Sequence, residues 1–273
     1  MIVDLHCHTT ASDGGLTPPE LIARAVEQGV ELLAITDHDT VDGYLTVCDQ
    51  SPIPLVAGIE LSCVWSKVTI HVLGLGIDPS HPAMAEGLAR QKIARAQRAE
   101  TIAERLEKRG FSGALAGAAA LAAGSPIGRP HFANFLLEQG HVNSFNQAFK
   151  KYLGAGKPGD VKALWPAMAE AVHWIESCGG VAVLAHPLHY KMTNTKLRAL
   201  LADFKLAGGR GLEVVNGRQQ ADNTLHLAKL AEQFELLASC GSDFHRPTPW
   251  SELGVMAQLP KHCRPVWLEL MPS

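Results

Sequence analysis

The sequence lacks any apolar run of about 18 residues, so a membrane-spanning helix is not expected. Aromatic residues make up only 6% of its 273 residues and no basic stretch is interleaved with them, which argues against an extended RNA-binding surface. The formal net charge of −3 disfavours a globally basic nucleic-acid-binding protein. Hydrophobic residues, at 47%, are plentiful enough to form a packed core, so a globular protein is expected.

The six cysteines lack both a Cys-x-x-Cys pair and a regular spacing. In a chain of this length they are expected as buried thiols in a reducing compartment rather than as a disulfide framework. The first residues, MIVDLHCHTTASDGG, show neither the basic region nor the cleavage site of an export signal. We therefore expect a cytoplasmic protein, with no membrane association.

Short β-rich segments alternate with helical segments over residues 1–78 and again over residues 157–273, with a last strand expected around residues 265–270. This alternation predicts an α/β fold with a parallel sheet and helices outside it, open or closed into a barrel. Active groups in such folds collect at the C-terminal ends of the strands.

Residues 79–156 have a different character, because they are helical and rich in alanine, with no convincing strand. We expect a helical insertion between two barrel strands. Its long helix over residues 89–110 carries arginines along one flank, with glutamates between them, which predicts a solvated, salt-bridged face. The arginines are Arg95, Arg98, Arg105 and Arg109.

Histidines and acids cluster at the predicted strand ends. His6 and His8 are two residues apart, so on a strand both imidazoles point to one face, about 7 Å apart, and can bind one metal ion. A single histidine on an apolar strand is usually structural, but the joint pattern predicts a metal site. The other candidate ligands are Asp13, His38, Glu60, His71, His186, Asp243 and His245. Histidine with carboxylate suits Mn, Fe or Zn better than Mg alone, and we expect Mn.

The order of these motifs (HxH, Asp, xDHD, GIE, IHxLG, AHP and GSDFH, within residues 4–245) resembles the PHP (polymerase and histidinol phosphatase) superfamily of metal-dependent phosphoesterases. The strings GRPHFA and KKYLGAGKP in residues 128–158 resemble one subgroup, the bacterial phosphatases of 3′,5′-bisphosphonucleotides, which are related to enzymes that trim RNA from a 5′-monophosphate end. Asp160 departs from the subgroup pattern, which has an aromatic residue near this position. The resemblance implies a distorted (β/α)7 barrel of residues 1–78 and 157–273, with residues 79–156 as a helical insertion capping the site.

The resemblance also implies three divalent ions. The implied ligands are His6, His8, Glu60 and Asp243 for the first ion, Glu60, His71 and His186 for the second, and Asp13, His38 and His245 for the third. Three carboxylates against about six positive charges leave a positive site for hydroxide and phosphate. The hypothesis is removal of the 3′-phosphate of nucleoside 3′,5′-bisphosphates, such as adenosine 3′,5′-bisphosphate, by in-line attack of a metal-bridging hydroxide.

Catalytic candidates are Asp13 and Glu60 through the metals, and His189, which either protonates the leaving oxygen or is a surface loop residue. Asp37 and Asp39 flank His38 and either orient it or cap a turn.

A second anion pocket is expected at residues 128–134, because an arginine and a helix N-terminus both bind phosphate. Its candidates are Arg129, His131 and Asn134, with Arg98 and Lys92 as weaker ones. The alternative is that Arg129 pairs with a surface acid and His131 caps the helix.

Two other functions remain open. The nearer one is another phosphoesterase, either a 5′–3′ exoribonuclease acting on short RNA 5′-monophosphate ends or a histidinol-phosphate-type phosphatase. The farther one is a catalytically silent metal-binding regulatory module, which the nine filled ligand positions disfavour. The expected partner is a small nucleotide, with short RNA 5′ ends second and no obligate protein partner.

Overall fold

The computed structural model describes residues 1–162 and 164–270. The chain forms two compact units, one of Met1–Leu88 with Pro166–Ser273 and the other of Ala89–Trp165. Each unit has its own hydrophobic core. No helix in the described ranges is long and apolar enough to cross a membrane. All six cysteines are free thiols, as the irregular spacing predicts.

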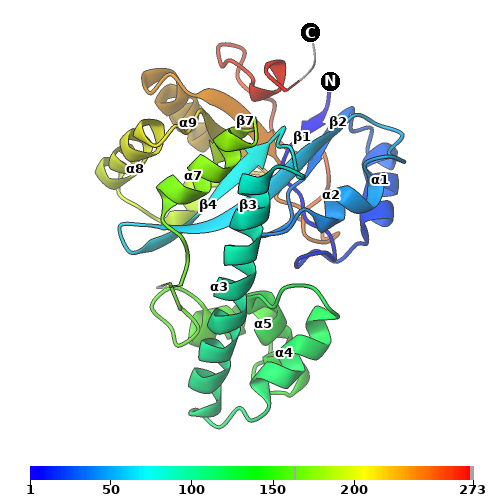
Figure 1. Ribbon diagram of the computed structural model, residues 1–273, viewed down its shortest axis with the longest axis vertical. Coiled ribbons are helices and arrows are strands. Elements are labelled where there is room, and N and C mark those ends of the chain that lie inside the picture. The colour runs from blue at the N-terminus through cyan, green and yellow to red at the C-terminus, as the bar shows by residue number, and fades with distance from the viewer. Residues whose placement is uncertain (163, 271–273) are drawn as a thin grey trace. The chain divides into compact units, whose positions relative to one another are not determined.

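The first unit is a barrel built on one seven-stranded sheet, in which the strands follow one another in chain order (Figure 1). The strands are β1 (Val3–Asp4), β2 (Leu32–Ile35), β3 (Leu55–Trp65), β4 (Val68–Leu75), β5 (Val181–Leu184), β6 (Gly211–Asn216) and β7 (Leu237–Gly241). The edges of β1 and β7 meet, because the Leu5 amide donates a hydrogen bond to the Cys240 carbonyl at 3.0 Å and the Asp243 amide donates one to His6 at 2.8 Å. The predicted (β/α)7 barrel is therefore confirmed.

One strand departs from the predicted parallel order, because β4 runs antiparallel to both β3 and β5. The cause is local. Only Ser66 and Lys67 separate β3 from β4, and both have positive φ, as the two central residues of a tight hairpin turn require. A parallel pair needs a crossover connection of a dozen or more residues, which this segment does not contain.

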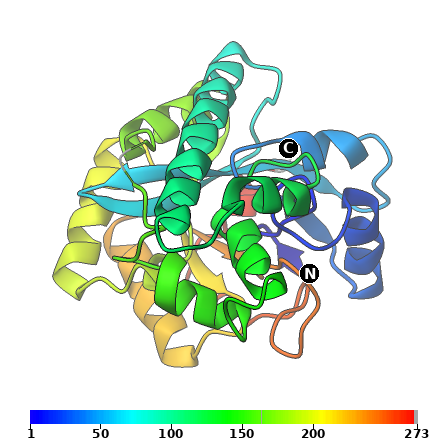
Figure 2. The same ribbon diagram turned by 90° about the horizontal axis from the view of Figure 1, so that it is seen from below.

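Helices of the first unit surround the strands (Figures 1 and 2). They are α1 (Pro18–Glu27), α2 (Asp42–Val47), α7 (Met168–Ser177), α8 (Asn194–Leu206) and α9 (Ala221–Gln233), with short 3-10 turns at Pro187–Tyr190 and Val266–Leu268. The start of α1 is set by a capping box, in which Thr17 and Glu20 satisfy each other's backbone amides. Leu21, Ile22 and Ala25 of this helix are buried.

The strand predicted around residues 265–270 is wrong, because this segment forms the 3-10 turn Val266–Leu268. A β-bridge joins Pro265 to Ala238 of β7, and the Ala238 amide donates a hydrogen bond to the Arg264 carbonyl at 2.8 Å. Closure of the barrel explains the difference. One edge of β7 pairs with β6, and the other is shared between Leu5, which bonds Cys240, and Arg264, which bonds Ala238, so a full eighth strand has no room.

The second unit is helical, as the sequence predicts for this part of the chain. Helix α3 (Pro82–Glu107) enters it and is followed by α4 (Ala114–Ala122), α5 (Arg129–Glu138), α6 (Phe145–Ala148) and a π-turn at Phe149–Leu153. Phe132 and Leu136 of α5 pack with Ile102 and Leu106 of α3 in its core.

The arginine flank of α3 is only partly the solvated face that the sequence predicts. Arg105 and Arg109 are exposed, but Arg95 and Arg98 are buried. Their guanidinium groups lie 5.5 Å and 5.1 Å from the ring centroid of Trp165, and the Arg98 Nε donates to the Val161 carbonyl at 3.0 Å. Helix periodicity alone does not reveal these partners, because both follow α3 by more than 50 residues.

Candidate metal centre

The candidate ligands gather at one end of the barrel. His6, His186 and Asp243 each lie two residues beyond a strand, namely β1, β5 and β7, and His38 lies three beyond β2. His71 belongs to the same end although it is near the start of β4, because an antiparallel strand begins where its parallel neighbours finish. The antiparallel strand β4 therefore places a ligand in the site from its N-terminal end, whereas a parallel strand does so from its C-terminal end.

Glu60, inside β3, is the centre of the cluster and is fully buried. Its Oε1 atom lies 2.8 Å from His71 Nδ1 and 2.8 Å from His186 Nε2. Its Oε2 atom lies 3.0 Å from His38 Nδ1, and 3.3 Å from the Nε2 atoms of both His6 and His8. The two oxygens of one carboxylate thus face two separate histidine groups, as a carboxylate shared between two cations does.

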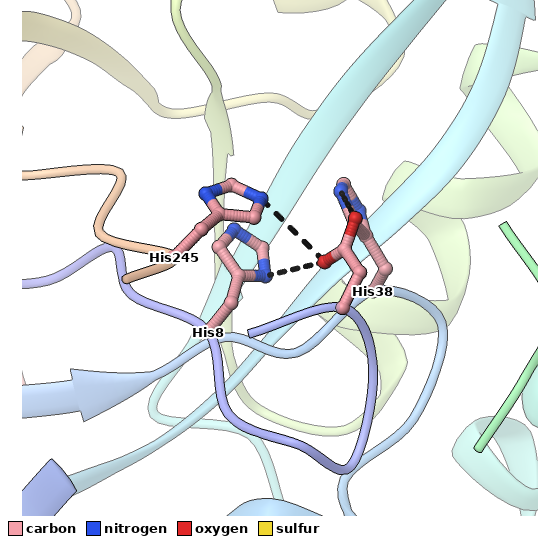
Figure 3. A group of neighbouring side chains, drawn as sticks. His8, His38 and His245 are labelled. Carbon is pink, nitrogen blue, oxygen red and sulfur yellow. Dashed lines mark ion pairs between the residues drawn. The ribbon is translucent and has the colours of Figure 1, made fainter. Parts of the chain in front are cut away.

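A second group is formed by His8, Asp13, His38 and His245, whose ligand atoms all lie within 4.8 Å of one another. Asp13 Oδ1 is 3.5 Å from His245 Nε2, and both its oxygens lie 4.0 Å from a nitrogen of His8 or His38. Figure 3 shows the three imidazoles turned toward a common carboxylate. His245 Nδ1 lies 2.9 Å from the Asp243 carbonyl, which only accepts, so Nδ1 carries the proton and Nε2 is left for a cation.

Asp243 completes the cluster on the side of His6 and His8. Its Oδ1 atom lies 3.4 Å from the Nε2 atom of each histidine. The groups that form in the structure are His6 with His8 and Asp243, His6 with Glu60 and His186, and His38 with Glu60 and His71. All nine predicted ligands come together, and His71 Nδ1 and His186 Nε2 lie 3.3 Å from each other beside the same oxygen of Glu60.

The donor atoms suit divalent cations. Buried ring nitrogens and one carboxylate oxygen have no hydrogen-bond partner among the described residues, and such atoms are costly to bury without one. They are His6 Nε2, both nitrogens of His8, His38 Nδ1, His186 Nδ1 and Glu60 Oε2. Cations are the partners that an array of imidazole and carboxylate donors accepts.

The charges of the cluster are strongly coupled. Burial lowers the pKa of His8, but the nearby carboxylates of Asp243 and Glu60 outweigh it and raise the pKa to about 10. Burial raises the pKa of Glu60, yet the charges of His38, His71 and His6 hold it well below its usual range. The carboxylates are thus ionised and draw positive charge into the site, which protons or metal ions supply.

A carboxylate that the sequence analysis missed supports two of these ligands. Glu213 of β6 is fully buried, and its Oε1 atom lies 2.9 Å from His6 Nδ1. Its Oε2 atom accepts hydrogen bonds from the His186 amide at 2.5 Å and from Asn216 Nδ2 at 3.1 Å. The signal was an acid at a core position of an otherwise apolar strand, GLEVVN.

Backbone strain is concentrated in the same place. His186, Asp39 and Asp243 have φ of 25°, 55° and 51°, in the left-handed region that side chains rarely adopt. Such residues cluster at functional sites, where surrounding contacts hold them. Here the Glu213 carboxylate holds His186, and Asp39 accepts a hydrogen bond from the Ser62 amide at 2.6 Å.

Asp37 positions the loop that carries Asp13. Its carboxylate accepts hydrogen bonds from the Thr9 amide at 2.7 Å, the Thr9 hydroxyl at 2.6 Å and the Ser12 hydroxyl at 2.6 Å. Of the two roles considered for Asp37, orienting His38 or capping a turn, these contacts match the second.

His189 lies beside the cluster. Its ring stacks on that of His186, with 5.0 Å between centroids, and its ligand atoms fall in one group with those of His186 and Asp243. Burial and the charge of His186 lower its pKa.

The predicted phosphate contacts belong to the second unit. His131 caps α5, because its Nδ1 accepts a hydrogen bond from the Gly128 amide at 2.9 Å. Arg129 Nη1 donates to the Leu153 carbonyl at 3.2 Å, and the guanidinium lies 5.8 Å from the Phe149 ring. Lys92 is exposed and Asn134 is half-buried. Their part in binding stays a prediction.

Comparison with known proteins agrees with this geometry. A 5′–3′ exoribonuclease of Escherichia coli is 47% identical over 272 residues, covering 98% of this chain and 93% of its own length. A 3′,5′-nucleoside bisphosphate phosphatase of Chromobacterium violaceum is 41% identical over 273 residues, covering 98% and 96%. A solved structure from the same organism, described as an amidohydrolase with bound sulfate and no metal, is 41% identical, superposes with a TM-score of 0.92 and covers 99% and 96%. The PHP domain family matches residues 4–154, and the chain belongs to that family.

Proposed function

We propose that this protein is a metal-dependent phosphatase that removes the 3′-phosphate of nucleoside 3′,5′-bisphosphates, such as adenosine 3′,5′-bisphosphate. The observation that carries the proposal is the position of Glu60, whose two oxygens lie within 3.3 Å of five histidine nitrogens. Such a centre suits hydrolysis at phosphorus, where clustered cations stabilise the attacking and leaving oxygens. The relative from C. violaceum, named for this activity, supports the substrate.

We further propose three divalent ions, with Mn as the expected metal and Fe or Zn as the alternatives that the donors also suit. The groups around Glu60, around Asp243 and around Asp13 support three positions, with His8 adjoining the third. When bound, the ions would supply Lewis acidity and an activated water. Asp13 and Glu60 act by holding them.

Other residues would handle the substrate. His189, beside His186, would protonate or hydrogen-bond the leaving oxygen. Arg129, His131 and Asn134 would bind the second phosphate, because a helix N-terminus and a guanidinium both attract anions, with Arg98 and Lys92 in lesser roles. The covering of the metal centre by residues 79–156 stays a prediction. The six free cysteines support action in a reducing compartment such as the cytoplasm.

A second candidate function is 5′–3′ exoribonuclease activity on short RNA with a 5′-monophosphate, favoured by the 47% identity with the E. coli enzyme of that name. The two reactions are chemically close. Removal of a 3′-phosphate from a bisphosphate breaks the bond between phosphorus and O3′, and release of a nucleoside 5′-monophosphate from the 5′ end of RNA breaks the same bond. One centre therefore serves both substrates if it tolerates a second nucleotide on the phosphate.

The test is phosphate release by Mn-reconstituted protein from adenosine 3′,5′-bisphosphate, with 5′-AMP, 3′-AMP and histidinol phosphate in parallel and 5′-phosphorylated RNA trimers as a further substrate. Release from the bisphosphate with 5′-AMP left intact is expected. Equal turnover of all the monophosphates would contradict the hypothesis of a second anion pocket. If the metal-loaded protein turned over none of these substrates, the catalytically silent regulatory module would be the remaining function.

A further inference from the structure

A small cavity of about 90 Å³ lies directly beside the candidate metal centre, with His186 and His189 in its wall. Its other polar lining residues are Asn216, Gln219 and Asn223, which come from the end of β6, the following loop and the start of α9. All five belong to the barrel unit. Three carboxamides next to two histidines of the cluster make this cavity a polar recess.

Two of the three carboxamides, those of Asn216 and Gln219, are oriented by the protein. Asn216 donates from Nδ2 to Glu213 at 3.1 Å, and Gln219 donates from Nε2 to the Val214 carbonyl at 2.5 Å and to the Thr224 hydroxyl at 2.8 Å. These bonds fix which end of each amide is nitrogen, and they use one donor of Asn216 and both donors of Gln219. The Oδ1 and Oε1 atoms have no protein hydrogen bond in the described ranges, so a ligand meets two acceptors.

Acceptors of this kind select a ligand that brings donors, such as a hydroxyl group. The volume allows about six water molecules at roughly 15 Å³ each, which corresponds to a sugar ring rather than to a whole nucleoside. A sugar bonded through O3′ to a phosphate at the metal centre must lie next to that centre. The recess bounded by His186 and His189 is in such a position.

Resting on the proposed function, we propose that this cavity holds the ribose whose O3′ carries the scissile phosphate. The amide oxygen of Gln219 accepts the hydrogen bond of its 2′-hydroxyl, and Asn216 lines the same cavity. A 2′-hydroxyl is the group that lets a protein distinguish RNA from DNA. A site built to hydrogen-bond a hydroxyl disfavours the analogue without it, because its polar atoms are left unpaired. The enzyme therefore prefers ribonucleotides to deoxyribonucleotides through this wall.

The experiment compares adenosine 3′,5′-bisphosphate with 2′-deoxyadenosine 3′,5′-bisphosphate as substrates of the Mn-loaded protein. We expect a kcat/KM ratio of about 10 in favour of the ribose form, equivalent to one neutral hydrogen bond. Gln219→Met removes the amide group but keeps a side chain of similar length. We expect it to reduce this ratio severalfold by lowering kcat/KM for the ribose substrate. Gln220→Met, at an exposed neighbouring glutamine that does not line the cavity, is the control and leaves the ratio unchanged.

A binding measurement separates this inference from the proposed function. Calorimetric titration of 5′-AMP and 2′-deoxy-5′-AMP requires no turnover, and we expect the same preference for ribose, reduced in Gln219→Met. Bound metal is measured in every variant and should not change. Turnover of neither bisphosphate together with a ribose preference in binding would overturn the phosphatase proposal alone. Equal binding and equal turnover of the ribose and deoxyribose forms by the wild-type protein would overturn the ribose pocket, whether or not the variants fold.

Discussion

Glu213 and His6 form a buried pair, with 2.9 Å between Oε1 and Nδ1, although 207 positions separate them in the chain. The carboxylate can only accept, so His6 Nδ1 carries the proton and Nε2 is directed to Glu60 and Asp243. The other oxygen holds the His186 amide. One carboxylate therefore fixes the ring of one candidate ligand and the strained backbone of another.

Glu213→Gln is expected to weaken metal binding by about 10–100-fold, as removal of a ligand's carboxylate partner does. An amide presents one acceptor, so either the His6 ring or the His186 amide loses its partner. Metal content after dialysis against limiting Mn measures the effect. Glu170→Gln, which alters an α7 capping carboxylate, is the matched control. Equal metal content in both variants would contradict the assigned role.

Glu60→Gln is expected to remove more metal than the loss of a peripheral ligand does. Its two oxygens face separate histidine groups, whereas His245 belongs to one group with a carboxylate. We expect Glu60→Gln to lose more than one ion per chain and at least about 100-fold in kcat. His245→Gln should lose about one ion. Elemental analysis of the two variants decides, and similar losses would show that Glu60 does not bridge.

Metal removal is expected to destabilise the fold. The cluster buries ionised carboxylates and imidazoles together, and ions that bind the folded state alone stabilise it by about 2.7 kcal/mol at 100 times the Kd. For a unit of this size we expect the Tm to fall by about 5–10 °C on chelation. Calorimetry with and without a chelator measures the shift. A Glu60→Gln variant should show a smaller shift, and an equal one would place the stabilising ion elsewhere.

Much of the site is predictable from the sequence because its residues occupy strand ends, where short motifs repeat with recognisable spacing. His6 and His8 follow β1 two residues apart, and His38, His186 and Asp243 follow β2, β5 and β7. The direction of β4 is not visible in apolar content, since hydrophobic alternation is the same in either direction. What reveals it is the two-residue connection at Ser66 and Lys67.

Long-range partners account for what the sequence does not predict. Glu213 is a lone acid without a motif, and its role depends on His6 and His186, which reach it only in the closed barrel. Arg98 lies on the same flank of α3 as the exposed Arg105, so helix periodicity predicts the same environment for both. In the folded protein, however, Arg98 contacts Trp165 and Val161, which come much later in the sequence. Periodicity describes one element, whereas these contacts join two distant ones.

The loop that follows His245 is tied down by an ion pair whose contribution depends on pH. Arg24 donates two hydrogen bonds to Glu252, which lowers the pKa of that carboxyl. A depressed folded-state pKa gives stability that is present above the unfolded value of about 4.3 and is lost as the pH falls through the folded value. Glu252→Gln should therefore cost at most about 1 kcal/mol at pH 7, and progressively less toward pH 3.

Chemical denaturation of Glu252→Gln at several pH values checks this expectation. Glu86→Gln, at an exposed glutamate of α3, serves as the control, with no loss expected beyond about 0.5 kcal/mol. A cost for Glu252→Gln that stays constant from pH 7 to pH 3 would mean that the ionised carboxylate is not what stabilises the loop.

Substitution of Arg98 tests whether the buried arginines of α3 stabilise the fold or bind the phosphate of the substrate. Its side chain is 6% exposed, donates to the Val161 carbonyl and lies over Trp165. Arg98→Ala leaves that carbonyl and the ring face without their partner, so we expect a loss of about 2–4 kcal/mol in the free energy of unfolding. Arg109→Ala, at an exposed position of the same flank, should change it by less than about 0.5 kcal/mol.

Denaturation curves give the stabilities of both variants, and the KM for adenosine 3′,5′-bisphosphate gives the second readout. A stable Arg98→Ala protein with a KM raised tenfold or more would instead assign Arg98 to phosphate binding.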